Sequence, residues 1–409
     1  MNAPVEVGRP VPLRIPFCRT EISLEARVAA QRILASGWIT SGPEVIEFER
    51  EFAEHVGARH AVAVSSCTAA IEIGLRSLQL PPRSRVLTST VTFCGAVHAI
   101  TRAGLVPVLC DVDPETLMPN AATTRAAVRR AGGADAMVAL HFAGQPAPVE
   151  ELAEAAGLPL SRVVEDAAHA IGTWAGARPV GTISAATCFS FYATKNLPIG
   201  EGGMLTTDLP AVAAAARELR LHGMSADAWR RYLPGRACWR YEVKSEGLKA
   251  NMTDLQAAMG RAQLRHLGSW QARRAELAAI FDAGLAGVPG IRLPARPATG
   301  RHAWHLYVVQ VEPEFGLDRD TLIERLSARG IDCSVHFIPL HHQPHFQRLL
   351  GPDLERAFPA ADIVFERIVS LPFFASLGDH EVERVCSEIA GLSEQSRATT
   401  GDLHLELTR

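Results

Sequence analysis

The chain has 409 residues, of which 47% are hydrophobic and 21% are charged, and its formal net charge is −3. This composition is typical of a globular protein with enough apolar material for two domains. The small net charge supplies no basic field for nucleic acid or anionic lipid, and no run of about 18 apolar residues is long enough for a membrane span. Because the N-terminal segment lacks the layout of a signal peptide, we expect a cytoplasmic protein.

The eight cysteines are scattered along the chain and form no CxxC pair. Most lie in apolar stretches, which is typical of reduced, buried thiols rather than of disulfides or a zinc site. The densest group of the fifteen histidines is "PLHHQPHF" at 339–346. No cysteine or pair of carboxylates lies near it in the sequence, so we expect no metal there.

The first elements in chain order are two helices, one from Glu21 to Ser36 and one that ends at Gly57. From residue 60 the chain alternates between short Val-, Leu- and Ala-rich runs and amphipathic helical segments. The predicted strands are "HAVAVSS", "SRVLTST", "VPVLCDVD", "DAMVALH" and "SRVVEDAA". This alternation predicts an α/β fold with a mostly parallel sheet, covered on both faces, over roughly residues 60–220.

The segment 251–287 predicts a long helix that joins this sheet to a second domain, with Asn251, Thr253 or Asp254 as its cap. From about residue 290 the pattern changes to that of a smaller α+β unit. The last residues are polar, and we expect them to fray. The predicted parts are a large domain at 1–265 that includes the N-terminal segment 1–20, a small domain at 266–393 and a polar tail at 394–409.

Polar groups follow two of the predicted strands, at the edge where parallel sheets bind ligands. Ser65-Ser66-Cys67-Thr68-Ala69 opens a helix, whose free N–H groups favour a phosphate, although plain N-capping would also explain a hydroxyl there. Asp166 ends a central strand, where a carboxylate needs a cation or several donors, unless it caps the next turn.

A third strand end, "FSFYATKNLPIGEGGM", places Lys195 between an apolar run and a glycine cluster. Lysine is rarely buried, so Lys195 is either a surface residue at a strand end or a group held inside for its chemistry. Pyridoxal phosphate requires a lysine amine for its Schiff base, a carboxylate at its pyridine nitrogen and an anion site for its phosphate. The three strand ends together supply these groups, and neither GxGxxG nor a GK[ST] ending competes with this interpretation. The glycines at 200, 202 and 203 let the backbone pass close to such a pocket, or they only shape a turn.

Several longer stretches strengthen this interpretation. They are "SGWITSGPEVIEFEREFAEHVGARHAVAVSSCTAAIEIGL", "VVEDAAHAIG", "SFYATKNLPIGEGGML", "NMTDLQAAMGRAQL", "VHFIPLHHQPHF" and "RIVSLPFFASL". In this order, over about residues 15–393, they resemble the DegT/DnrJ/EryC1/StrS family of pyridoxal-phosphate-dependent nucleotide-sugar aminotransferases. The resemblance implies the aspartate-aminotransferase-like fold (fold type I). It also implies a homodimer in which the partner's loop near 247–251 completes each active site.

The resemblance assigns roles to individual residues. Lys195 would form the Schiff base and carry protons, Asp166 would pair with the pyridine nitrogen, and His169 would contact the ring oxygen. The remaining cofactor contacts would be Phe93, stacked on the ring, and Thr68, Ala69 and Ser190 at the phosphate. The sequence departs from the family at Ser66-Cys67-Thr68, where many relatives read Ser-Gly-Thr. It departs again at Gly247-Leu248-Lys249-Ala250-Asn251, where relatives often read Gly-x-Asn-x-Arg, so that either Asn251 or Lys249 contacts the phosphate across the dimer interface.

The stretch "LHGMSADAWRRY" at 221–232, followed by "YEVKSEGLKANMTD", resembles enzymes that aminate the 4-keto group of a nucleotide-linked sugar. The resemblance implies L-glutamate as the donor and a dTDP- or UDP-linked 4-keto hexose or pentose as the acceptor. Candidate sugar or diphosphate contacts are Trp38, Lys249 and His336, although Trp38 is equally well a dimer-interface aromatic. An aminocyclitol or 3-keto-sugar aminotransferase is the alternative enzyme. The alternative outside enzymes is a pyridoxal-phosphate-binding regulator, against which the retention of Lys195, Asp166 and His169 argues.

Overall fold

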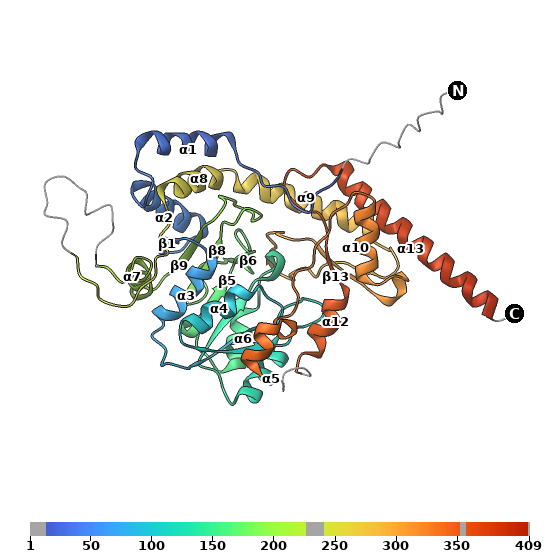
Figure 1. The fold of residues 1–409 in the computed structure, drawn as a ribbon, viewed down its shortest axis with the longest axis horizontal. Coiled ribbons are helices and arrows are strands. Elements are labelled where there is room, and N and C mark those ends of the chain that lie inside the picture. Colours follow the sequence, from blue (N-terminus) through green and yellow to red (C-terminus); the bar gives the residue numbers. More distant parts are fainter. Residues whose placement is uncertain (1–13, 226–240, 352–356, 408–409) are drawn as a thin grey trace, which may run out of the picture.

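The computed structural model describes residues 14–225, 241–351 and 357–407 (Figure 1). Its largest sheet has seven strands: β1 (His60–Val64), β2 (Arg85–Ser89), β3 (Val106–Cys110), β4 (Ala136–Leu140), β5 (Val163–Asp166), β8 (Ala186–Ser190) and β9 (Gly203–Thr207). Their order is β1-β9-β8-β5-β4-β2-β3. Within this sheet β9 alone runs opposite to the other six strands, so the predicted mostly parallel sheet is confirmed.

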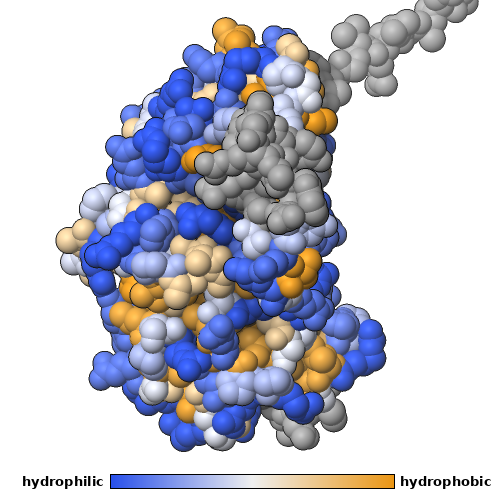
Figure 2. Space-filling view, turned by 90° about the vertical axis from the view of Figure 1, so that its left-hand side faces the viewer, coloured by the Kyte–Doolittle hydropathy of each residue, from blue (hydrophilic) through white to orange (hydrophobic). Residues whose placement is uncertain are grey.

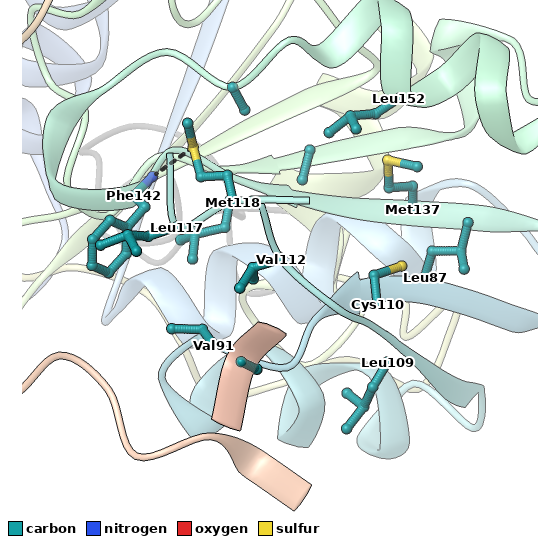
Figure 3. Packing of buried hydrophobic residues seen from close by; sticks show 14 of the residues in the cluster. Leu87, Val91, Leu109, Cys110, Val112, Leu117, Met118, Met137, Phe142 and Leu152 are labelled. Carbon is teal, nitrogen blue, oxygen red and sulfur yellow. Dashed lines mark hydrogen bonds between the residues drawn. The ribbon is translucent and has the colours of Figure 1, made fainter. Parts of the chain in front are cut away.

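Helices cover both faces of this sheet because successive strand residues point to opposite sides. Met137 and Ala139 of β4 pack with α5 (Ala121–Ala131) and α6 (Val149–Ala156). Their neighbours Ala136 and Val138 pack on the other face, in a cluster with three helices: α3 (Cys67–Ser77), α4 (Cys94–Arg102) and α7 (Pro210–Leu219). Figure 3 shows part of the first cluster, in which Leu152 lies near Met137 and the amide of Phe142 contacts the sulfur of Met118.

The predicted N-terminal helices form as α1 (Leu24–Ser36), which is capped by Ser23, and α2 (Pro43–Val56). The single helix expected at 251–287 is wrong, because the chain forms α8 (Asp254–Leu264) and then α9 (Leu267–Leu285). Thr253 is the cap of α8, with Gln256 completing a capping box. The break falls where the chain changes partners, since α8 packs against α1 and α2 whereas α9 packs against the C-terminal helix (Figure 1).

The C-terminal part is the expected smaller α+β unit. Its sheet has the order β10-β12-β13, with β10 at Ile291–Arg292, β12 at Val308–Val311 and β13 at Ile368–Ser370. Four helices accompany this sheet in the described residues: α10 (Arg319–Ala328), α11 (Pro344–Leu350), α12 (Pro359–Arg367) and α13 (Asp379–Leu407). A third sheet joins β11 (Gly300–Arg301) to β6 (Trp174–Ala175) and β7 (Arg178–Pro179), and so ties this part to the loops of the first.

The two ends of the chain differ from expectation. Ile15, which we grouped with the large domain, pairs with Ile331 and packs in the core of the C-terminal part. The polar tail at 394–409 continues α13 as far as Leu407 instead of fraying from its start. Ser396 explains this in part, because its side chain is buried and donates a hydrogen bond to the carbonyl of Phe315. In the part of the chain that the structure describes, no helix has the length and apolar character needed to cross a membrane.

Candidate active site

A cavity of about 470 Å³ lies at the carboxyl ends of the parallel strands, between the two parts of the chain. This is the edge at which α/β sheets bind their ligands, as the sequence predicts. Its first side, which we call the sheet wall, contains Thr68, Phe93, Asp166, His169, Ser190 and Lys195. Its second side, which we call the C-terminal wall, contains His305, Leu306, His336, Phe337 and Phe373.

Lys195 lies in the loop after β8 and reaches into this cavity. Its Nζ is 3.5 Å from Nε2 of His305, and its backbone amide donates to the carbonyl of Tyr192. Burial lowers the pKa of Lys195 from 10.5 to about 8, although the charge of Asp166 opposes this. Lys195 is therefore an inward-facing amine that loses its proton more readily than a surface lysine.

Asp166, at the end of β5, is only 5% exposed. Its Oδ1 accepts a hydrogen bond of 3.0 Å from the amide of Ala168 and lies 3.7 Å from Sγ of Cys67. Burial raises the pKa of Asp166, while the Ala168 amide and the charge of Lys195 act in the opposite direction. No lysine or arginine among the described residues forms an ion pair with it. A cation placed in the cavity would therefore find a carboxylate whose burial is only partly compensated.

His169 is also buried, and its hydrogen bond defines which ring nitrogen carries the proton. Its Nδ1 lies 3.2 Å from the backbone amide of Ala143, which can only donate, so Nδ1 accepts. Burial holds the pKa of His169 well below its usual value, and the charge of Lys195 adds to this effect. His169 is therefore a neutral imidazole that carries its proton on Nε2.

The start of α3 forms the third corner of the sheet wall. Oγ of Ser66 accepts from the amide of Ala69 at 3.1 Å, so Ser66 caps the helix. Thr68 lines the cavity, whereas Ala69 lies outside the lining. Close backbone approach explains Gly203, because a Cβ there would lie 2.5 Å from the carbonyl carbon of Ser66. A Cβ on Gly95 would likewise lie 2.5 Å from Oγ1 of Thr68, so this corner is kept open by glycine.

The residues predicted to bind the sugar are not brought together in the same way. His336 lines the cavity, but Trp38, Lys249 and Asn251 do not. Asn251 instead accepts a hydrogen bond from Lys249 and donates one to Ser41. Residues 226–232 of the stretch at 221–232, on which the substrate prediction depends, lie outside the described residues.

Sequence reasoning missed several lining residues. They are Phe17, Cys18, Tyr192, Glu201, His305 and Phe337. Glu201 and Tyr192 flank Lys195 in the stretch that identified it, so that stretch carried a signal for them. His305 belongs to "HAWHLYVV", which predicts only the approach to a strand. Phe337 directly follows the candidate His336 in "VHFIPLHHQPHF", so that stretch carried a signal for it, but only the packing of the two parts of the chain places it at the cavity.

The histidine cluster at 339–346 contains three groups that could ligate a metal, since side-chain atoms of His341, His342 and Asp362 lie within 4.8 Å of one another. Hydrogen bonds account for this arrangement. Oδ1 of Asp362 lies 2.8 Å from Nε2 of His341 and 2.7 Å from Nε2 of His342, while Nδ1 of His341 lies 2.7 Å from Oγ1 of Thr90. The cluster lies outside the cavity lining.

Taken together, the sheet wall offers an inward-facing lysine, a buried carboxylate and a helix start kept open by glycine. This donor set fits pyridoxal phosphate, which needs an amine, a partner for its ring nitrogen and a phosphate site. The fold and the cavity thus define a pyridoxal-phosphate-dependent enzyme of fold type I.

Comparison with known proteins identifies the family. The profile of the DegT/DnrJ/EryC1/StrS aminotransferase family matches residues 21–390, and the chain belongs to this family. A curated relative, the spore coat polysaccharide biosynthesis protein SpsC of Bacillus subtilis (strain 168), is 43% identical over 377 residues, which cover 92% of this chain and 96% of SpsC.

Solved structures agree in fold. One of them is Spr1654 from Streptococcus pneumoniae, described as a sugar aminotransferase. Its PMP-form superposes with a TM-score of 0.84 at 29% identity and covers 93% of this chain and 100% of Spr1654. A PLP-form of Spr1654 is also solved. The aminotransferase TlmJ from Streptoalloteichus hindustanus has a TM-score of 0.82 at 32% identity and covers 93% of this chain and 98% of TlmJ. The protein is thus a sugar aminotransferase that uses pyridoxal phosphate.

Proposed function

We propose that this enzyme transfers the amino group of L-glutamate to the 4-keto group of a dTDP- or UDP-linked hexose or pentose. The observation that carries the proposal is the meeting of Lys195, Asp166 and His169 in one cavity whose other side can receive a sugar. The similarity to SpsC supports a role in polysaccharide biosynthesis. The 4-position is inferred from the resemblance at 221–254.

Lys195 is the residue that would bind the cofactor covalently and move the proton. Its lowered pKa of about 8 increases the fraction of neutral amine near neutral pH, which both tasks require. When bound, pyridoxal phosphate supplies an electron sink for the carbon that loses or gains a proton. Asp166 would hold the ring nitrogen in its protonated form, because a cation there offsets the burial of the carboxylate.

His169 would donate its Nε2 proton to the ring oxygen, because the amide of Ala143 already occupies its other nitrogen. Phe93 is 60% exposed at the rim of the cavity, where an aromatic side chain can stack on the ring. Thr68 and Ala69 at the start of α3, together with Ser190 at the end of β8, would hold the phosphate. Ala69 would act through the helix start, since it lies outside the cavity lining.

The C-terminal wall receives the sugar. His336 is the candidate sugar contact there, and its Nδ1 lies 2.9 Å from Oγ of Ser370, which leaves Nε2 available to a ligand. Burial lowers the pKa of His336 to about 4, so it acts as a neutral group. Trp38 and Lys249 remain candidates only for a site that a second protomer completes, because neither lines the cavity of its own chain.

We propose a homodimer. Several apolar side chains of the N-terminal region are more than half exposed, and they are Leu24, Val28, Leu34, Ile39 and Ile46. Figure 2, which views the side on which α1, α2 and α7 lie in Figure 1, shows apolar areas among the polar ones. Such an array is typical of an interface. Asn251 or Lys249 would then contact the cofactor phosphate of the partner.

The cysteines among the described residues are free thiols, which favours a reducing compartment such as the cytoplasm.

The test separates the two halves of the reaction. Purified enzyme loaded with pyridoxal phosphate is first mixed with L-glutamate alone, and the visible absorbance of the bound cofactor is followed. We expect that absorbance to change and one equivalent of 2-oxoglutarate to form. The aminated enzyme is then offered 4-keto and 3-keto nucleotide sugars, with dTDP and UDP forms in parallel, and products are identified by mass spectrometry. Amination of only the 3-keto sugars or of an aminocyclitol precursor would reject the 4-position, and absence of the glutamate step would reject the donor.

A further inference from the structure

His305 lies against the reactive lysine, yet neither the cofactor nor the sugar assignment uses it. The residue precedes β12 and is only 5% exposed. Its Nε2 is 3.5 Å from Nζ of Lys195, a long hydrogen bond. Contacts of this kind are often long in the ligand-free enzyme and shorten when the reacting groups are in place.

The direction of this hydrogen bond follows from the next two residues in the network. Nδ2 of Asn196 donates to the carbonyl of Ala303 at 2.8 Å, which fixes the orientation of the amide. Oδ1 of Asn196 is therefore the atom that faces Nδ1 of His305, at 3.2 Å, and an oxygen there can only accept. The proton of His305 must lie on Nδ1, and the lone pair of Nε2 must point at Lys195.

His305 and His169 are thus two neutral histidines with opposite tautomers. The centroids of their rings are 4.4 Å apart, and burial holds the pKa of each imidazole well below the usual value. The Ala143 amide leaves His169 with its proton on Nε2, whereas Asn196 leaves His305 with a lone pair on Nε2. One ring is built to donate into the cavity and the other to accept from the lysine.

Hydrogen bonds to the backbone of His305 and of the residue before it hold the histidine in place from two sides. Nη1 of Arg274 donates to the carbonyl of Trp304 at 3.0 Å and to that of His305 at 3.3 Å. The amide of His305 donates to the carbonyl of Ala143 at 2.9 Å. Trp304 has φ = +50° and Ala143 has φ = +56°, a backbone conformation that is strained for residues other than glycine. Strain of this kind persists where the surrounding structure enforces it, often at functional sites.

We propose that His305 is a positioning residue for Lys195: its Nε2 accepts an N–H of the lysine and so turns the lone pair of the amine toward the bound cofactor. The proposal rests on the proposed role of Lys195 as the reactive amine. Asn196 sets the tautomer, and Arg274 and Ala143 set the position of the ring. Other titratable groups that face Lys195 are Asp166, His169, His336, Cys67 and Cys18, and they are the same in every variant compared below.

Two substitutions of similar size separate the acceptor from the packing. In His305→Gln, the terminal oxygen reaches the place of Nε2 and still accepts from Lys195. In His305→Asn, the shorter amide reaches only the place of Nδ1, so it keeps the bond to Asn196 and loses the contact with Lys195. The readout is the rate at which cyanate labels Lys195 in the full-length, cofactor-free protein between pH 6 and 10, measured by peptide mass spectrometry.

We expect half-maximal labelling near pH 8 for the unchanged protein and for His305→Gln, because an acceptor stabilises the ammonium form. In His305→Asn the midpoint should fall by roughly one unit, the shift that corresponds to about 1.4 kcal/mol. Equal shifts in both variants would assign His305 a merely structural role, and no shift in either would also overturn the proposal. This readout needs neither glutamate nor a sugar, so it stands apart from any failure of the proposed function.

A second measurement covers the case in which His305→Asn does not fold. Nitrogen-15 spectra of histidine-labelled, unsubstituted protein distinguish protonated from unprotonated ring nitrogens. The signals of His305 are assigned by their absence from His305→Gln. We expect a protonated Nδ1 and an unprotonated Nε2 for His305, and the reverse for His169. A protonated Nε2 on His305 would overturn the proposal whatever the variants do.

Discussion

The sheet wall and the C-terminal wall of the cavity are held in different ways. Asp166 is the last residue of β5, and Lys195 lies in the loop after the neighbouring strand β8, so hydrogen-bonded strands bring the two residues to one edge of the sheet. On the opposite wall, His305 and His336 lie outside the named strands. Hydrogen bonds join their side chains to Asn196 and Ser370, and further hydrogen bonds join the backbone of His305 to Arg274 and Ala143. We infer that the chemistry common to the family depends on the wall built on the sheet, and that substrate choice depends on the wall built from loops, which sequence changes remodel more easily.

The largest effect should come from the sheet wall at Lys195. In Lys195→Ala the reactive amine is gone, and we expect kcat to fall by about 10⁴-fold, the upper range for a positioned acid–base group. Added methylamine should restore part of the glutamate step, because the space left by the side chain can admit a small amine. Retention of more than one hundredth of the activity, with the protein properly folded by circular dichroism, would contradict the assignment.

Asp166→Asn tests the same wall with two opposite effects. Loss of the charge at the ring nitrogen should lower kcat by about 10²- to 10³-fold, the size typical of a preorganised electrostatic contact. Because burial raises the pKa of Asp166, its ionised form destabilises the cofactor-free fold above the ordinary aspartate pKa of about 3.9. The variant without cofactor should therefore melt at a higher temperature than the parent at pH 7, and this gain should vanish as the pH falls toward 4. A lower melting temperature at pH 7 would show that Asp166 is already compensated.

The structure indicates how far the sequence could have predicted these walls. Parallel strands share one carboxyl edge, so Asp166 and Lys195 could be placed together from the strand pattern without knowing any contact. His305 is 110 positions from Lys195 and meets it only because the C-terminal part packs over the sheet. No local pattern encodes that packing. The break between α8 and α9 was missed for the same reason, since apolar spacing continues while the packing partners change.

Gly203 tests how the sheet wall is supported. In Gly203→Ala the new methyl group would meet the backbone at Ser66, which leads directly into α3. We expect the free energy of unfolding to fall by about 1–3 kcal/mol, as for overpacked sites, together with weaker binding of the cofactor phosphate. Gly268→Ala is the matched control, because a Cβ there meets nothing within 4 Å and the helix α9 should be unaffected or slightly more stable. Equal stability of the two variants in urea unfolding would mean that β9 can move away from residue 66.

The smallest effect should come from the C-terminal wall. His336→Ala removes a neutral side chain from the sugar side of the cavity, and we expect the KM for the sugar to rise roughly tenfold, the loss of one hydrogen bond of about 1.4 kcal/mol. The half-reaction with glutamate should keep its rate, because Lys195, Asp166 and His169 are unchanged. His342→Ala is the control, since His342 is half-buried beside Asp362 and outside the cavity lining. If His336→Ala slowed the glutamate step as much as the sugar step, the two walls would not divide the reaction as we propose, and His336 would belong with the groups that serve the cofactor.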